Sequence, residues 1–175
     1  ASTNRIKCYA RAIKEGGLDC EVLLFRRTEV YGKQPRNTVG QGIINGVPFR
    51  YVGQTPLRGR NVVIRQINDK IDVLRTEAYL RRHLADGDVL FMFMGPYMKA
   101  MMRFMNVAKI KGAYCVRELC ELPYGTGVET KKKARMRMIT LEQLFPKLDG
   151  VISISYTLLN LAQTYTSPSC KHIKV

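Results

Sequence analysis

The sequence has few acidic residues, which distinguishes its charge from that of an ordinary globular chain. Only 14 aspartates and glutamates oppose 29 lysines and arginines, so the formal net charge is +15. This excess of positive charge favours an anionic partner, such as a nucleic acid, a phosphorylated substrate or an anionic membrane surface. Net charge of this kind indicates partners and does not indicate a fold.

Paired cysteines and clustered histidines are also missing. The sequence contains no Cys-x-x-Cys pair, and its five cysteines are an odd number. A secreted disulfide framework is therefore disfavoured, and reduced thiols fit a cytoplasmic setting better. The two histidines, His83 and His172, have no partner at a spacing typical of zinc ligands, so we expect no metal site.

Long apolar runs and nucleotide-binding glycine motifs are absent as well. The longest apolar run, VLFMFM at 89–94, is far too short to span a bilayer. No Gly-x-Gly-x-x-Gly follows a strand-like segment, and there is no phosphate-loop lysine motif, which disfavours a dinucleotide-dependent oxidoreductase. The glycines of GQGIING belong to a predicted hairpin, where Asn45-Gly46 suits a tight turn.

What the sequence does contain is an alternation of strand-like and helix-like segments. The predicted strands cover 20–25, 88–94, 113–116 and 150–155, with a further one beginning at 172. The predicted helices cover 2–15, 60–84, 97–108, 131–145 and 156–165. Strands that are apolar throughout are covered on both faces. We therefore predict one α/β domain over residues 1–175: a Rossmann-like, doubly wound, mostly parallel sheet with helices on both faces and a small β-hairpin insertion.

Two of the predicted helices have a clear apolar periodicity. In the first, the apolar positions are Ile64, Ile67, Ile71, Leu74 and Ala78. In the second they are Met98, Met101, Met102, Met105 and Ala108. We expect the methionines to belong to the core, because methionine readily fills irregular space there.

The stretch CVRELCELPYGTG places two acids, Glu118 and Glu121, after the point where a buried strand is expected to stop at Arg117. Ligands of parallel sheets bind beyond the carboxyl ends of the strands. Carboxylates beside tyrosine and glycine suit sugar hydroxyls, although pairing of the acids with Arg117 or nearby lysines is an equal alternative. The residues expected at this edge are Arg26, Arg27, Gly95, Pro96, Tyr97, Glu118, Glu121 and Tyr124.

A run of cations, KKKARMR, occupies 131–137. It can be a solvated helix face, or it can attract anionic lipid headgroups or nucleic acid. Met136 and Met138 allow some apolar insertion, and the aromatic residues expected for stacking on single-stranded nucleic acid are absent. We therefore favour a membrane-surface patch made of Lys131, Lys132, Lys133, Arg135 and Arg137.

The order of these segments resembles the amino-terminal domain of family 4 glycosyltransferases, retaining enzymes with two facing Rossmann-like domains (the GT-B fold). Four stretches carry the resemblance: ASTNRIKCYARAIKEGGLDCEVLLF, DVLFMFMGPYM, GAYCVRELCELPYG and LDGVISISYTLLNLA. Together they span nearly the whole chain. The resemblance implies that this domain binds the acceptor in polysaccharide, glycolipid or glycoconjugate biosynthesis, while a second domain binds the nucleotide sugar.

The resemblance also implies site residues and missing parts. Ser2, Thr3, Asn4 and Arg5 would lie beside a glycine loop at the cleft, and Glu118 and Glu121 match the two acids of the strand exit. The first strand, that glycine loop and the donor-binding domain with its paired glutamates are expected outside this chain, so this part alone is expected to be inactive. The main catalytic residues are accordingly expected elsewhere.

The expected partners follow from the same reasoning. They are a sugar or lipid-linked acceptor, a nucleotide sugar held by the missing domain, and an anionic membrane surface, with no cofactor besides the nucleotide-sugar substrate. A cytoplasmic protein at the inner face of the membrane fits these expectations. A basic α/β nucleic-acid-binding module, or another Rossmann-type sugar-nucleotide enzyme, is the alternative.

Overall fold

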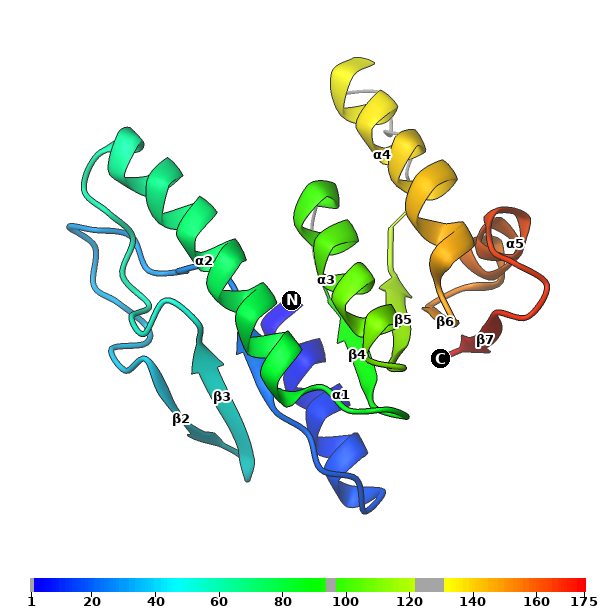
Figure 1. The fold of residues 1–175 in the computed structure, drawn as a ribbon, viewed down its shortest axis with the longest axis horizontal. Helices are drawn as coiled ribbons and strands as arrows, with labels where there is room; N and C mark the ends of the chain where they lie inside the picture. Colours follow the sequence, from blue (N-terminus) through cyan, green and yellow to red (C-terminus); the bar gives the residue numbers. More distant parts are fainter. Residues whose placement is uncertain (1, 94–96, 122–130) are drawn as a thin grey trace. The chain divides into compact units, whose positions relative to one another are not determined.

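The computed structural model describes residues 2–93, 97–121 and 131–175, and the side chains of residues 2, 3, 131–134, 136 and 137 are left out of that description (Figure 1). The chain forms two compact units, Ala1–Tyr79 and Leu80–Val175, which are called the first and second unit below. Each is described by itself. That residues 1–175 form a single domain stays a prediction.

The first unit contains a small mixed sheet and two helices. Its elements are α1 (Ser2–Glu15), β1 (Val22–Leu24), β2 (Gln41–Ile44), β3 (Val47–Tyr51) and most of α2 (Val62–His83). The strand order is β1-β3-β2, with β1 parallel and β2 antiparallel to β3. The bounds of α1 are those predicted, because Gly17 adopts φ 81°, a conformation that ends helices.

The predicted hairpin is confirmed. Ile44 pairs with Val47, and the two residues between them, Asn45 and Gly46, have φ values of 53° and 77°. Positive φ at both central positions is the requirement of the tight turn that Asn-Gly favours.

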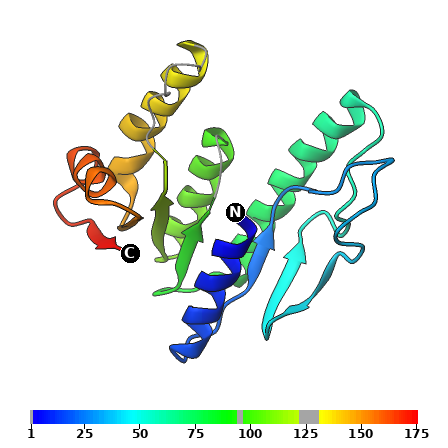
Figure 2. The same cartoon turned by 180° about the vertical axis from the view of Figure 1, so that it is seen from behind.

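The second unit alternates strands with helices. Its elements are β4 (Val89–Met92), α3 (Met98–Ile110), β5 (Tyr114–Leu119), α4 (Lys131–Leu144), a short 3-10 helix (Phe145–Lys147), β6 (Gly150–Ser153), α5 (Tyr156–Tyr165) and β7 (Lys171–Lys174). The four strands pair in the order β4-β5-β6-β7 and are all parallel (Figure 2). This confirms the predicted α/β class with a Rossmann-like parallel sheet.

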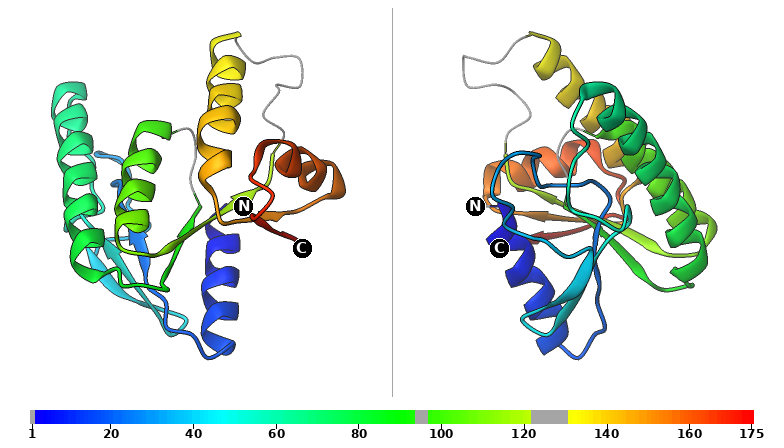
Figure 3. Two further views of the ribbon diagram at one scale, coloured as in Figure 1. Left: turned by 45° about the vertical axis from the view of Figure 1, so that its right-hand side comes forward. Right: turned by 90° about the vertical axis from the view of Figure 1, so that its left-hand side faces the viewer.

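One apolar core joins the sheet of the second unit to its helices. Met101 and Met105 of α3, Leu141 of α4 and Leu158 of α5 pack with Cys115 of β5 in this core. The expectation that the methionines of α3 belong to the core is therefore confirmed for the two that are fully buried. In the views of Figure 3, α3, α4 and α5 cover the same face of this sheet.

The opposite face of the same sheet is also apolar. Side chains alternate along a strand, so Tyr114 and Val116 point away from the face that carries Cys115. With Val89, Ile152 and Ile173 they line a shallow apolar hollow. Val89, Tyr114 and Ile173 are exposed there.

Candidate functional site

The carboxyl edge of the second unit's sheet is the place where the sequence predicts a site. The register aligns the strand ends: Met92 pairs with Arg117, Leu119 with Ser153, and Ser153 with Lys174. The residues that follow these ends therefore lie along one edge. Those that the structure describes include Tyr97, Glu121, Ser155 and Tyr156.

The two predicted acids lie in different environments. Glu118 belongs to β5 itself and is only 6% exposed, whereas Glu121 lies two residues beyond the strand and is exposed. Because side chains alternate, Glu118 points away from the face that carries the core. Glu121 is thus the acid that solvent or a ligand reaches directly. That both acids serve a binding site stays a prediction.

Tyr97 stands at the beginning of α3. Its side chain is exposed and makes no capping hydrogen bond, while its carbonyl oxygen accepts the N–H of Met101 at 3.0 Å. The first N–H groups of a helix have no acceptor within the helix and carry a partial positive charge. A hydroxyl oxygen or an anion could accept hydrogen bonds from these N–H groups. Gly95, Pro96 and Tyr124, which were predicted beside it, lie outside the described residues.

Arg117 lies near this edge, and the end of its strand was predicted wrongly from the sequence. The strand was expected to stop at Val116, but β5 continues to Leu119. The strand can continue because the guanidinium turns into the core. There Nη1 donates to Met101 Sδ at 3.1 Å, and Cζ lies 5.8 Å from the centre of the Phe145 ring. Burial lowers the pKa of Arg117 to about 10. The group therefore remains a cation at neutral pH.

A buried hydroxyl lies on the same side of the sheet as Arg117. Ser153 ends β6 and is fully buried, and its Oγ makes no hydrogen bond to any residue that the structure describes. Its pairing with Leu119 puts it two pairs further toward the carboxyl edge than Arg117, which pairs with Val151. No local pattern in the sequence indicates that this hydroxyl is special, because a serine at the end of a strand is common.

The beginning of α5 forms the far part of the edge. Ser155 caps this helix by accepting the N–H of Leu158 at 3.3 Å. The next residue, Tyr156, is largely exposed, and Lys174 Nζ lies 4.6 Å from the centre of its ring. No local pattern in the sequence indicates this cation–π pair, because its members are far apart in the chain.

The predicted site residues of the first unit lie at the beginning of α1. The helix begins at Ser2, so Ser2 and Thr3 lie within its first turn and do not precede it. Asn4 is exposed, and Arg5 is half-buried and engaged in an interaction. That these four residues border an acceptor cleft stays a prediction.

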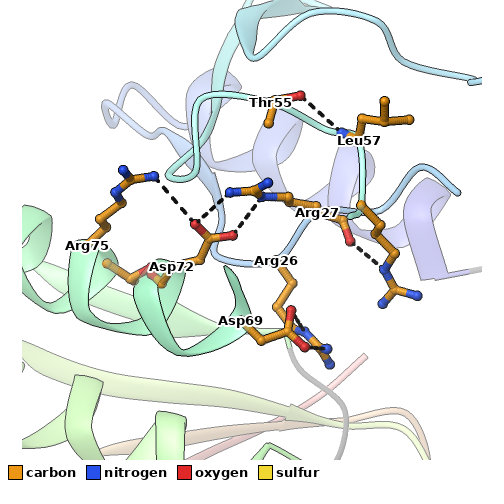
Figure 4. Close-up of polar contacts among 9 residues, drawn as sticks. Arg26, Arg27, Thr55, Leu57, Asp69, Asp72 and Arg75 are labelled. Carbon is orange, nitrogen blue, oxygen red and sulfur yellow. Dashed lines mark hydrogen bonds and ion pairs between the residues drawn. The ribbon is translucent and has the colours of Figure 1, made fainter. Parts of the chain in front are cut away.

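Arg26 and Arg27, which were expected at a ligand-binding rim, are engaged with carboxylates of α2 (Figure 4). Arg26 makes a two-point contact with Asp69, and Arg27 Nε donates to Asp72 Oδ2 at 3.0 Å. Asp72 is completely buried, and its Oδ1 atom also lies 3.8 Å from Nη1 of Arg75. These arginines therefore attach α2 to the loop that follows β1, which is a structural role.

The predicted membrane-surface patch lies on the first turns of α4. Arg135 is exposed there, and the side chains of Lys131, Lys132, Lys133 and Arg137 are not among those described. Met138 packs against the apolar core of the second unit. Met138 is half-buried there, and its insertion into a membrane stays a prediction.

No group of histidine, cysteine, aspartate or glutamate side chains within the described ranges could hold a metal ion. None of the helices in those ranges combines the length and the apolar character needed to cross a bilayer. Comparison with known proteins gave no matching family model, no matching curated protein and no matching solved structure.

Proposed function

We propose that this chain is the acceptor-binding half of a retaining glycosyltransferase of the two-domain GT-B type. The observation that carries the proposal is the carboxyl edge of β4–β7, where a tyrosine at a helix N-terminus and an exposed carboxylate follow neighbouring strands. Parallel α/β sheets bind ligands at this edge. Carboxylates, hydroxyls and helix N-termini are groups that orient sugar hydroxyls.

The proposed reaction breaks the bond between the anomeric carbon of the donor sugar and its nucleoside diphosphate. The acceptor hydroxyl oxygen forms the new glycosidic bond on the same face of the sugar and loses its proton, and the nucleoside diphosphate leaves. A separate donor-binding domain would hold the nucleotide sugar. Closure of the two domains would exclude water and limit hydrolysis of the donor.

This half would contribute by positioning the acceptor. Glu121 accepts hydrogen bonds from acceptor hydroxyls, and the amides that begin α3, beside Tyr97, donate to an acceptor oxygen. Glu118 supports this edge from within β5. The cations at the beginning of α4 hold the chain near an anionic membrane, which suits a lipid-linked or polysaccharide acceptor.

The proposal is tested by measuring the binding of octyl β-D-glucoside, a simple lipid-linked sugar, below its micelle concentration by isothermal titration calorimetry. The Glu121→Gln variant removes the charge with little change of shape, and we expect it to weaken binding by roughly tenfold, since hydrogen bonds to charged groups are the stronger ones. Glu142→Gln is the matched control. Glu142 is an exposed glutamate in the last turn of α4, which leads back to the opposite end of the sheet.

If the two variants bind the glucoside with equal affinity, Glu121 is not part of the binding site. If the wild-type chain does not bind the glucoside, the proposed acceptor-binding role is wrong. A salt-dependent gel shift of random-sequence RNA, in the absence of any sugar binding, would instead support the nucleic-acid-binding alternative.

A further inference from the structure

Helix α2 carries an apolar surface that faces solvent. Side chains of Val63, Ile64, Ile67, Ile71 and Leu74 lie at spacings of one, three and four residues, so they share one side of the helix. We call these five residues the α2 stripe. All are exposed: Ile67 is 51% and Leu74 is 53% accessible to solvent. A continuous apolar surface of this kind normally marks an interaction site.

The outward orientation of the α2 stripe is fixed by the other side of the helix. The inward side carries Asp69, Asp72 and Thr76, and the two carboxylates are paired with Arg26 and Arg27 (Figure 4). Thr76 Oγ1 donates to the carbonyl oxygen of Asp72 at 2.7 Å. Rotation of α2 to bury the stripe would break a buried ion pair, which is strongly unfavourable.

A close approach of the backbone also holds this orientation. A Cβ atom at Gly53 would lie 2.6 Å from Asp72 Oδ1, so the loop before α2 lies directly against the buried carboxylate. Arg58 Nε reinforces the loop by donating to the carbonyl oxygen of Arg27 at 3.0 Å. The stripe is thus presented outward by a set of contacts that involve its own helix and two loops of the first unit.

The charges around the α2 stripe are mainly positive. Lys70 lies three residues from Ile67 and four from Leu74, and Arg75 lies four from Ile71, so the two cations flank the apolar side chains. Both are exposed, and Arg82 is an exposed cation further along the helix. Two of the three acids of α2 face inward, and the third, Glu77, lies three residues beyond Leu74, at the edge of the stripe. The stripe therefore combines apolar side chains with a net positive rim.

These charges indicate which kind of partner can cover the α2 stripe. A second copy of the chain would bring Lys70 and Arg75 of two helices together, and like charges disfavour such a contact. A specific protein interface engages roughly 20–30 residues a side, far more than one convex stripe offers. A bilayer surface needs no shaped groove: apolar side chains enter between the lipids while cations meet the phosphate groups.

We propose that the α2 stripe docks this chain on an anionic lipid bilayer, with α2 lying in the plane of the membrane. This inference does not rest on the proposed transferase activity, because it uses neither the sheet edge nor a sugar.

A tryptophan reporter tests the proposal directly, because the chain contains no tryptophan. In the Leu74→Trp variant, fluorescence emission is measured with vesicles of phosphatidylcholine and phosphatidylglycerol and with vesicles of phosphatidylcholine alone. We expect a shift to shorter wavelength with the anionic vesicles only, because the indole leaves water. The control is Ile43→Trp in β2, a position that is 74% exposed and far from α2 in the sequence. Equal shifts in both variants, or no shift at Leu74→Trp, would overturn the proposal.

Co-sedimentation with the same anionic vesicles tests whether the stripe causes binding. We expect the Ile67→Ser/Leu74→Ser variant to bind roughly tenfold more weakly than the wild type. The matched control Leu18→Ser/Ile43→Ser, which changes two other exposed apolar residues, should bind unchanged. If circular dichroism shows that the serine variant is unfolded, the Lys70→Glu/Arg82→Glu variant replaces it in the co-sedimentation measurement. We expect this variant to bind the anionic vesicles roughly tenfold more weakly as well.

Unchanged binding by the variant that folds would overturn the proposal. So would a dimer, detected by sedimentation equilibrium, that the serine substitutions abolish, because the occupant would then be a second copy. Binding by the wild type to neither kind of vesicle would leave a soluble protein as the occupant and would also overturn the proposal.

Discussion

Helices α2 and α3 have similar sequence patterns and opposite packing. Both repeat apolar residues at three- and four-residue spacing. In α3 the apolar side is buried, with Met101 and Met105 in the core of the second unit. In α2 the polar side is buried: Asp72 is completely inaccessible to solvent, while Ile67 is half exposed. Periodicity therefore predicts an amphipathic helix, but the partners of the helix decide which side is covered.

The difference extends to what stabilises each unit. The second unit has a continuous apolar core that includes residues from α3, α4 and α5. Buried groups of the first unit include Glu29, Asp72 and Thr76 beside a few apolar residues such as Phe49 and Tyr51. The first unit should therefore respond to pH and to the loss of charge, and the second to the loss of packed volume.

The largest effect is expected from a cavity in the second unit. Phe145 is almost completely buried, so Phe145→Ala should lower the free energy of unfolding by about 4 kcal/mol. The measurement is urea denaturation followed by circular dichroism. Ile110→Ala, at a position that is 73% exposed, is the control and should change stability by less than about 0.5 kcal/mol. Similar losses in both variants would contradict the assigned core.

A smaller but still large effect is expected from the buried ion pair of the first unit. Asp72→Asn leaves the guanidinium of Arg27, which is mostly buried, without its carboxylate and should cost about 3 kcal/mol. Asp69→Asn makes the same chemical change at a more exposed pair and should cost less than about 1 kcal/mol. If the two variants are equally stable, the polar side of α2 does not hold the helix as described.

The pH dependence of the first unit should come in part from Glu29. Its carboxylate accepts the N–H of Arg36 at 2.8 Å and the hydroxyl of Thr28 at 2.9 Å. The backbone hydrogen bond from Arg36 is the main cause that lowers the pKa of Glu29 in the folded state.

A lowered folded-state pKa means that the unfolded chain takes up the proton first. The stabilisation is therefore complete well above the ordinary pKa of 4.5 and is lost as the pH falls through that value toward the folded-state pKa. Unfolding midpoints measured across this range should fall more steeply for the wild type than for Glu29→Gln. At neutral pH this variant should be less stable by about 1–2 kcal/mol. Parallel pH profiles would exclude Glu29 as the titrating group.

The smallest effect concerns thiol reactivity and involves no change in stability. Burial raises the pKa of Cys115 to about 11 and also raises the pKa of Cys170, whereas Cys8 is exposed. Iodoacetamide at pH 8 should therefore label Cys8 in the folded protein and leave Cys115 and Cys170 unlabelled until urea unfolds the chain. Peptide mass spectrometry gives the labelled positions, and rapid labelling of Cys115 in the folded state would contradict its place in the core.

Local signals in the sequence predicted the local features well. The Asn45-Gly46 hairpin, the bounds of α1 and the parallel α/β sheet are all confirmed, because each depends on residues close in the chain or on strand composition. The features that the sequence did not reveal depend on distant partners. Arg27 and Asp72 are 45 positions apart. No periodicity indicates such a pair, so neither the structural role of Arg26 and Arg27 nor the outward orientation of α2 could be foreseen.

Some features of the candidate site could likewise be predicted from the sequence, and others could not. That Glu121 and a helix N-terminus follow neighbouring parallel strands could be predicted from the sequence. The extension of β5 through Arg117 could not, because it requires Met101 and Phe145 to receive the guanidinium. For the same reason, the unequal exposure of Glu118 and Glu121 became visible only in the structure.

The most direct test of the proposed acceptor site is a two-dimensional ¹H–¹⁵N NMR titration of the whole chain with octyl β-D-glucoside. Amide signals of Tyr97, Glu121 and Ser155, at the carboxyl edge of the parallel sheet, should shift with a common binding curve. The amide signals of Tyr114 and Lys171, which begin β5 and β7 at the opposite edge of the same sheet, should not shift. Shifts confined to the opposite ends, or to α2, would contradict the account.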